Sequence, residues 1–480
     1  MKLRLTNWVD RCGCRAHLMR RNSGASLVTF ANTQIAKAIL VLWVLIFAAF
    51  IVWRLNLYFQ VSRQLKAIRA AELPASPVEL ERWYARVPDS SNAAIPLVKA
   101  FELLKTFPDA RSNRIAKIRL PERGKKWSPE EQDLVAEYVA MNAEALALAR
   151  EAVQRPQCRY PIALSYGLMT DTPHLAGLKE LTRIASYRAF LSAEQGRAPD
   201  WTQDIRLILQ LACTLEKEPL LISQLLRHSF IELAAHTTER CLGVADAGDD
   251  LGTLIYAFEM VENTNALWLA LVGERASAIP VFRLSWAEMK RIGANAEGGS
   301  PQSKPPPLAG QPNPLFWLSG LFERELNFFL QAMETNIALA ALPPPASLVV
   351  TNLADQLSKL AKRRHYILSG LLLPTFWNAI IRTAGSFARI RLVRTALAIE
   401  RFRAEHNRLP ESLDELVPGL LPAVPADPFD GAPLRYRKLE KGYVVYSVDR
   451  DGQDDGGRER PADRTRRDET TYDITFVVER

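Results

Sequence analysis

The residues best suited to chemistry form an acidic loop late in the 480-residue chain. Four aspartates lie within seven positions there, and glycines interrupt them. The candidate ligands are Ser447, Asp449, Asp451, Asp454 and Asp455. Carboxylates this close repel one another, and a hard cation with about six to eight oxygen ligands relieves that repulsion. The loop therefore predicts a Ca²⁺ site, although the arginines of segment 458–467 could neutralise the aspartates instead.

A second polar pattern is spaced for one face of a helix. His228, Glu232 and His236 follow one another at intervals of four residues, as a metal or acid–base site would need. Polar contacts between packed helices explain the same spacing more simply. The chain has no G-x-S-x-G, H-E-x-x-H or G-x-G-x-x-G pattern, so hydrolase, zinc-protease and dinucleotide-binding functions lack motif support. We therefore assign no catalytic residue, and the sequence leaves open whether the protein is an enzyme, although it favours one that is not.

Positive charge is concentrated at one end of the chain. The net charge is +8, and residues 1–37 hold seven basic residues against Asp10, which accounts for +6 of it. Binding to a phosphate backbone needs basic residues clustered on the folded part of a protein. We therefore expect no nucleic-acid partner.

A strongly apolar run follows this basic segment. Ala38 to Trp53 are sixteen uncharged residues between Lys37 and Arg54, and the range 35–55 approaches the roughly 20 residues that a bilayer core needs. The long basic lead and the missing small-x-small site argue against a cleaved signal peptide. Because basic residues are in excess before the run, we expect an inner-membrane protein with a cytoplasmic N-terminus and a periplasmic or otherwise extracytoplasmic bulk.

Helical patterns fill the region after the apolar run. Ser128-Pro129-Glu130-Glu131 is typical of a helix start with a capping box, and the helix should continue to about Val153. Further helices are expected over Leu178–Glu194, Trp201–Glu216, Pro219–Leu242 and Leu251–Arg275. Short loops between amphipathic helices predict a bundle of helical hairpins.

These patterns predict a mainly α protein with six segments. They are a basic cytoplasmic tail at 1–34, a transmembrane helix at 35–55, a helical domain at 61–295, a Pro/Gly-rich linker at 296–314, a helical segment at 315–383 and a small α+β module at 384–480. Within the helical segment, Tyr366–Ile381 is apolar enough for a second membrane span. Gly370, Pro374 and Asn378 favour a helix packed against its neighbours instead.

The last segment reads as a long helix followed by a hairpin. The helix is expected over about Ala384–His406, and strands over Leu434–Leu439 and Tyr443–Val448. A three-residue loop at Glu440–Gly442 would join them, with Gly442 supplying the positive φ. We expect the hairpin to pack on the long helix.

This tail resembles the C-terminal half of the major pseudopilin (G type) of type II secretion systems. The resemblance lies in the Leu-Pro turn at Leu409, the D-P-F-D-G motif that begins at Asp427 and the S-V-D-R-D-G motif that begins at Ser447. It implies calcium in the loop after the second strand, held by Asp451 and the Ser447 carbonyl. The chain departs from the family pattern with Asp449 in place of a glycine and an arginine-rich insertion.

The N-terminus does not continue this resemblance. Thr29 stands where a pseudopilin has glutamate, and the apolar run begins about ten residues late. Through Asn92-Ala93-Ala94 and the Leu-Pro turn at Leu409, the whole chain also resembles uncharacterised membrane proteins of planctomycetes and verrucomicrobia. We therefore expect a single-pass envelope protein with a helical scaffold or interaction domain that binds a protein partner or its own copies. A secretion-associated component that assembles laterally and an envelope enzyme of unrecognised reaction are the alternatives.

Overall fold

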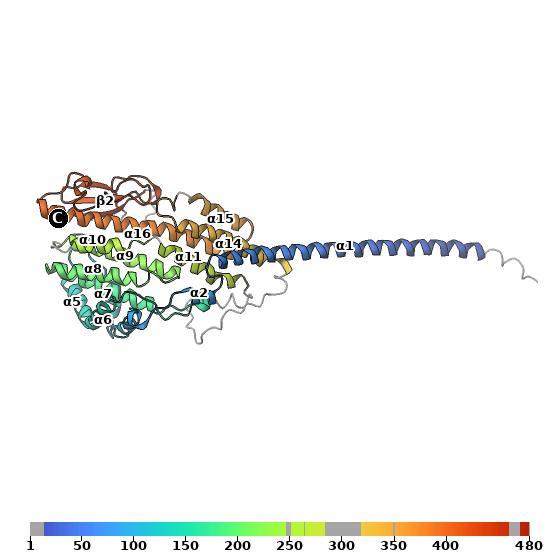
Figure 1. Ribbon diagram of the computed structural model, residues 1–480, viewed down its shortest axis with the longest axis horizontal. Helices are drawn as coiled ribbons and strands as arrows, with labels where there is room; N and C mark the ends of the chain where they lie inside the picture. The colour runs from blue at the N-terminus through green and yellow to red at the C-terminus, as the bar shows by residue number, and fades with distance from the viewer. Residues whose placement is uncertain are drawn as a thin grey trace, which may run out of the picture. The chain divides into compact units, whose positions relative to one another are not determined.

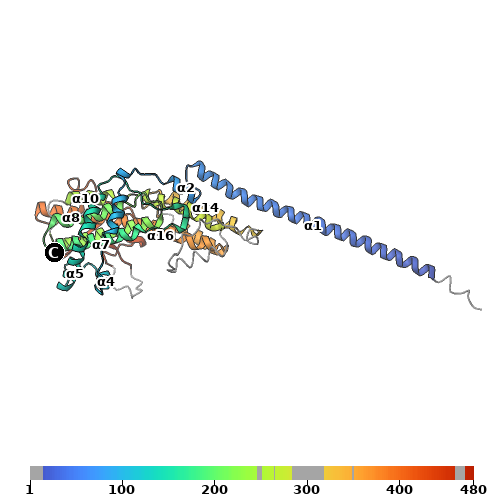
Figure 2. The same cartoon turned by 90° about the horizontal axis from the view of Figure 1, so that it is seen from below.

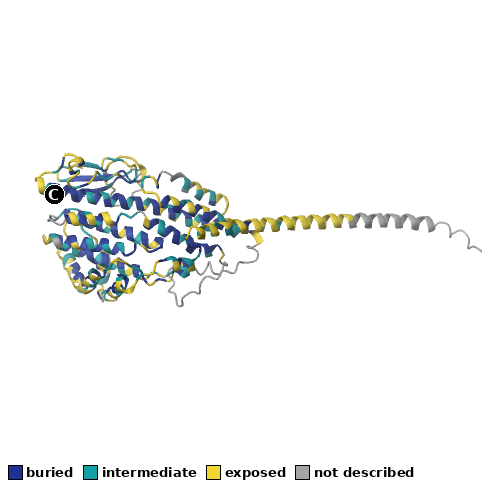
Figure 3. Cartoon of the chain, in the orientation of Figure 1, coloured by how far each residue is buried: buried dark blue, intermediate teal, exposed yellow. Residues whose placement is uncertain are grey.

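The computed structural model describes residues 14–245, 251–263, 265–283, 318–348, 351–459 and 471–479 (Figure 1). The chain forms two compact units, Met1–Gln64 and Leu65–Arg480. Most of the helix α1 (Cys14–Ala70) belongs to the first unit. Its segment Gln34–Ala70 is long and apolar enough for a membrane anchor or a signal sequence, and none of its most apolar window is buried (Figure 3).

The second unit, called the body here, begins with short helices. They are α2 (Pro77–Trp83), η1 (Asp89–Ser91), α3 (Ala94–Glu102), α4 (Arg111–Lys117), α5 (Pro129–Met141), α6 (Ala143–Ala152) and η2 (Leu164–Met169). The predicted capping box of Ser128 and Glu131 is confirmed at the start of α5. The prediction that this helix reaches Val153 is wrong, because it ends at Met141.

Asn142 is the physical reason for that break. Its side chain is fully buried, and its Nδ2 donates to the Lys105 carbonyl at 3.1 Å and to the Tyr138 carbonyl at 3.0 Å. Its Oδ1 accepts the Lys105 N–H at 2.8 Å. The amide thus supplies hydrogen bonds to the backbone of another segment, and the helix restarts as α6.

The central helices follow the predicted order. They are α7 (His174–Glu194), α8 (Ala198–Cys213), α9 (Leu221–Leu242), α10 (Leu251–Met260), α11 (Asn265–Ala278) and η4 (Ile279–Arg283). The range predicted as one helix from Leu251 to Arg275 is divided in two. Asn263 lies at the division and accepts the Asn265 N–H through its Oδ1 at 2.8 Å, which gives α11 a new start.

The next helices are α14 (Leu321–Ala340), α15 (Thr351–Arg363) and α16 (Ile367–His406). The predicted linker 296–314 lies outside the described residues. The apolar Tyr366–Ile381 segment and the predicted long helix are parts of the single helix α16, which contains Pro374. By length and composition α16 could also cross a membrane, but 39% of its most apolar window is buried in the body.

The described β-structure is one antiparallel sheet of β1 (Arg435–Lys438), β2 (Tyr443–Ser447) and β3 (Ile474–Val478), in that order. The 3₁₀ turns η5 (Leu413–Leu416) and η6 (Asp449–Asp451) flank the hairpin. Lys438 pairs with Tyr443, so the connecting loop has one residue more than predicted. Gly442 has a φ of 97°, as the hairpin predicted.

The sheet and the helices share a hydrophobic core. The hairpin packs on α16 as predicted, and the Tyr443 hydroxyl donates to the Ala396 carbonyl at 3.1 Å. One cluster of buried side chains includes residues of α7, α8, α9, α10 and α16 together with Val445, Phe476 and Val478 of the sheet. Figure 3 shows buried residues along most of α16. The tail is therefore packed into the helical body.

Candidate functional site

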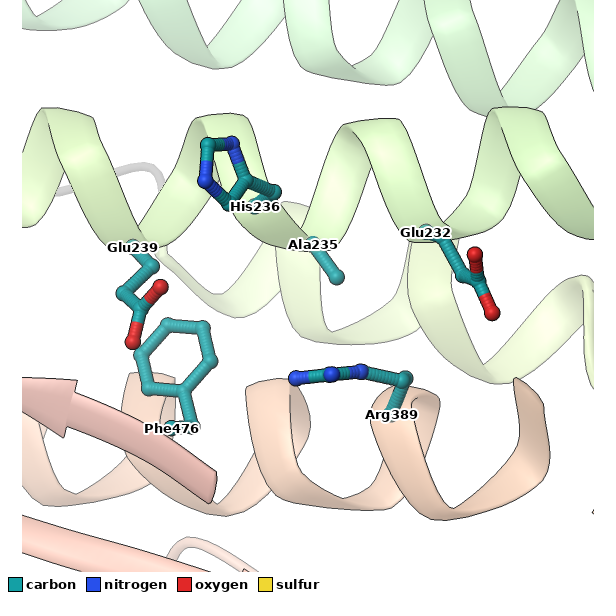
Figure 4. A pocket seen from close by; sticks show the side chains of 6 residues that line it. All are labelled: Glu232, Ala235, His236, Glu239, Arg389 and Phe476. Carbon is teal, nitrogen blue, oxygen red and sulfur yellow. The ribbon is translucent and has the colours of Figure 1, made fainter. Parts of the chain in front are cut away.

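A polar pocket opens where α9, α16 and β3 meet (Figure 4). Its volume is about 220 Å³. The residues that line it are Glu232, Ala235, His236, Glu239, Arg389 and Phe476. The four residues from α9 are spaced by three and four positions, so they lie on one face of that helix. Arg389 comes from α16 and Phe476 from β3.

Two charged residues of the pocket hold β3 in place. The Arg389 Nη1 donates to the Thr475 carbonyl at 3.0 Å. The Val477 N–H donates to the Glu239 Oε1 at 2.9 Å, which satisfies a backbone group on the outer edge of the sheet. Burial raises the pKa of Glu239, against the opposing effects of the Arg123 charge and the Val477 hydrogen bond.

The remaining polar groups of the pocket do not form an acid–base pair. His236 lines the pocket and accepts hydrogen bonds from Arg240 through its Nε2, and its ring is partly desolvated there. Burial lowers the pKa of His236 to about 4, helped by the charges of Arg240, Arg389 and Arg123. The ring is thus neutral at neutral pH, as its bond to Arg240 also requires. Among the described residues no hydrogen bond joins it to Glu232 or Glu239.

The predicted set of His228, Glu232 and His236 is only partly brought together in the structure. Glu232 and His236 share the pocket, but His228 lies away from it. Over eight residues an α-helix makes two full turns and about 80° more. The His228 side chain therefore faces a different direction from that of His236. The His228 ring is buried against α16, where its Nε2 forms a hydrogen bond of 3.1 Å with the Thr383 hydroxyl. His228 is therefore a packing residue between two helices.

The acidic loop is held by contacts within the protein. The Asp451 Oδ1 accepts the Gln453 N–H at 3.1 Å, and the Asp455 Oδ1 accepts the Thr471 hydroxyl at 2.9 Å. The Asp454 Oδ1 accepts the Gly456 N–H at 2.9 Å, and its Oδ2 lies 3.5 Å from the Arg435 Nε. Asp449 adopts a positive φ of 56° in η6.

No three acidic, histidine or cysteine side chains in the described part of the chain are grouped so that they could hold a metal ion. The Ca²⁺ site therefore stays a prediction from the sequence. Its alternative, neutralisation by the arginines of 458–467, falls mostly outside the described residues. An arginine that does approach the loop is Arg435 of β1.

Asp427 is the important residue that sequence reasoning did not single out. It is fully buried, and its Oδ1 accepts the Phe429 N–H at 3.0 Å and the Ser447 hydroxyl at 2.8 Å. Its Oδ2 accepts from the Arg435 Nη1 at 2.8 Å and from the Val448 N–H at 2.9 Å. The side chain of the predicted ligand Ser447 is thus bound to Asp427. The Asp-Pro motif was the available signal, and it marks a structural carboxylate.

Comparison with known proteins does not assign the chain to a family. No protein-family model, curated protein or solved structure matches the chain. The resemblance of its tail to pseudopilins rests on the sequence motifs alone.

Proposed function

We propose that the chain is a single-pass inner-membrane protein whose body is an extracytoplasmic scaffold for a protein partner or for further copies of the chain. The observation that carries this proposal is the apolar segment Gln34–Ala70, whose most apolar window has no buried residue. Exposed apolar side chains on this scale are costly in water and favourable in lipid. The basic residues before the segment favour a cytoplasmic N-terminus.

The polar contacts of the body support a scaffold more than an enzyme. Glu239 and Arg389 bind the backbone of β3, and Asp427 binds the start of the acidic loop. These charged groups join elements that are far apart in the sequence. A body whose elements are joined in this way suits binding, in which preformed surfaces lower the entropic cost of association.

The test of the anchor is extraction of membranes with alkaline carbonate. We expect the full chain to stay in the pellet. Substituting both Val44 and Leu45 by Arg places two charges near the middle of the apolar run 35–55, at a cost of roughly 5 kcal/mol or more, and should release the protein. The matched control substitutes Ile367 and Leu371, two exposed apolar residues of α16, by Arg. Wild-type protein in the supernatant would contradict the anchor. Release of the control variant would contradict the assignment of the anchor to the N-terminal run, because that run is unchanged in it.

Topology and processing are tested on the same material. Green fluorescent protein fused to the C-terminus should stay dark, and alkaline phosphatase fused there should be active. Mass spectrometry of the native N-terminus separates the scaffold from the pseudopilin-like alternative. Cleavage after Gly24, which would leave Ala25 first, would favour the latter.

A further inference from the structure

A second cavity lies in the body, away from the polar pocket. It has a volume of about 550 Å³ and adjoins a hollow of about 400 Å³ that shares Glu216, Lys217 and Leu269 with it. The chain after α2, the chain after α6, the end of α8 and α11 contribute its walls. We call the two neighbouring spaces together the α2–α8 cleft.

The walls of the α2–α8 cleft are mainly aromatic and aliphatic. Trp83, Tyr84, Val87 and Leu269 line it, and the Trp83 ring lies 6.4 Å from the ring of Trp268, which lines the adjoining hollow. A cavity of this size and lining suits the apolar part of a small ligand. Cys158 and Cys213 also line the cleft, and both are free thiols.

Positive charges outnumber negative charges around the α2–α8 cleft. Arg86 is exposed on its wall and has no partner among the described residues. Lys217 is paired with Glu216 at 3.2 Å. Behind the wall, Arg227 is fully buried and interacts electrostatically with Glu216. The buried carboxylate of Glu218 and the guanidinium of Arg159 both act on Tyr84, and their charges offset one another. Arg86 and Arg227 therefore remain in excess, and this excess favours an anionic ligand group.

Arg227 is the strongest part of this imbalance. Its Nη2 donates to the Val261 carbonyl at 2.7 Å, while its Nε and Nη1 have no hydrogen-bond partner. No carboxylate in the described residues lies within ion-pair distance of it. A buried cation with no carboxylate in direct contact is costly, and an anion in the neighbouring cleft would reduce that cost.

The α2–α8 cleft lies close in the chain to the end of α1. Trp83 follows Ala70 by thirteen residues. The Arg69 Nε and Nη2 donate to the Glu79 Oε1 at 3.0 and 2.9 Å, which ties the last residues of α1 to α2. Figures 1 and 2 show α2 near this end of α1.

We propose that the α2–α8 cleft binds a fatty-acid-type amphiphile, with its apolar chain between Trp83 and Leu269 and its single anionic group near Arg86. The membrane supplies the ligand, which is the step that rests on the proposed anchor. Binding itself depends on the body alone. Failure of carbonate extraction and failure of ligand binding are therefore separate results.

The test is protection of cysteines from maleimide in the full chain, held in nanodiscs of zwitterionic lipid. Dodecanoate should slow the labelling of Cys158 and Cys213 several-fold, as read by peptide mass spectrometry. Cys241 is fully buried in the core and serves as the internal control, because its labelling should not change. Dodecanol and dodecylamine have the same chain without the negative charge and should protect less.

Two variants with matched controls locate the ligand. Val87→Trp fills the cleft from a loop and should abolish protection, whereas Val78→Trp on the exposed face of α2 should keep it. Arg86→Gln should reduce protection by dodecanoate to the level seen with dodecanol, and Arg437→Gln on the exposed part of β1 should not. Absence of protection in the wild type would overturn the proposal. Equal protection by dodecanoate and dodecylamine would overturn it too.

Discussion

Single buried polar side chains connect distant parts of the body. Asp427, His228 and Asn142 each form hydrogen bonds with groups from another segment of the chain. A buried polar group costs free energy unless its hydrogen bonds are satisfied, so each of these residues fixes the position of its partners. The stability of the body should be sensitive to them individually.

We expect Asp427→Asn to destabilise the body by about 3 kcal/mol, because it removes the charge that faces Arg435 and turns an amide toward the Val448 N–H. The measurement is the midpoint of urea unfolding. Asp430→Asn is the matched control, since Asp430 pairs with the same arginine but is partly exposed, and about 0–1 kcal/mol is expected there. Equal effects of both changes would contradict the role given to Asp427.

The pH dependence of stability should reveal His228. Burial, and then the charge of Arg227, lower its pKa to about 3, whereas the ring has a pKa near 6.5 when the chain is unfolded. The unfolded state therefore binds more protons between these values, so the neutral ring stabilises the fold above pH 6.5 and this contribution is lost as the pH falls toward 3. His228→Gln should flatten the profile in that window. His365→Gln, at an exposed position, should leave the profile unchanged.

Elements with local signals were predictable from the sequence. The capping box at Ser128 and the glycine of the hairpin depend on neighbouring residues alone, and both are confirmed. The break at Asn142 depends on Lys105, a partner outside the helix, so an apolar periodicity could not show it. The pocket could be predicted only in part for the same reason. The spacing of Glu232 and His236 places both on one helix face, but Arg389 joins them only because α9 packs on α16.

At the level of the hairpin, we expect Gly442→Ala to cost at least about 2 kcal/mol. Gly442 has a positive φ, and a Cβ there would lie 1.8 Å from the Val478 carbonyl oxygen of β3. The loop and the third strand would thus both be disturbed. Gly419→Ala is the control, since an added Cβ meets nothing within 4 Å and the stability should change little. Thermal unfolding of the two variants distinguishes these outcomes.

The whole body should unfold as one unit. Leu65–Arg480 is compact, and one core joins the central helices to the sheet. We expect a fragment that begins at Leu65 to show one cooperative calorimetric transition with calorimetric and van't Hoff enthalpies in agreement. The predicted module 384–480, expressed alone, should not give such a transition, because it lacks α9 and α10. Two transitions in the longer fragment would contradict this expectation.

The hydrogen bond between Glu239 and the Val477 N–H also constrains how the sequence can evolve. It joins α9 to a strand more than two hundred positions later, so neither side can be exchanged by recombination without harming the other. A tail inherited from another gene would fit only after compensating changes had arisen on α9. Pairs of substitutions across this contact are thus expected among descendants of one ancestor, and independent replacement of either segment is not.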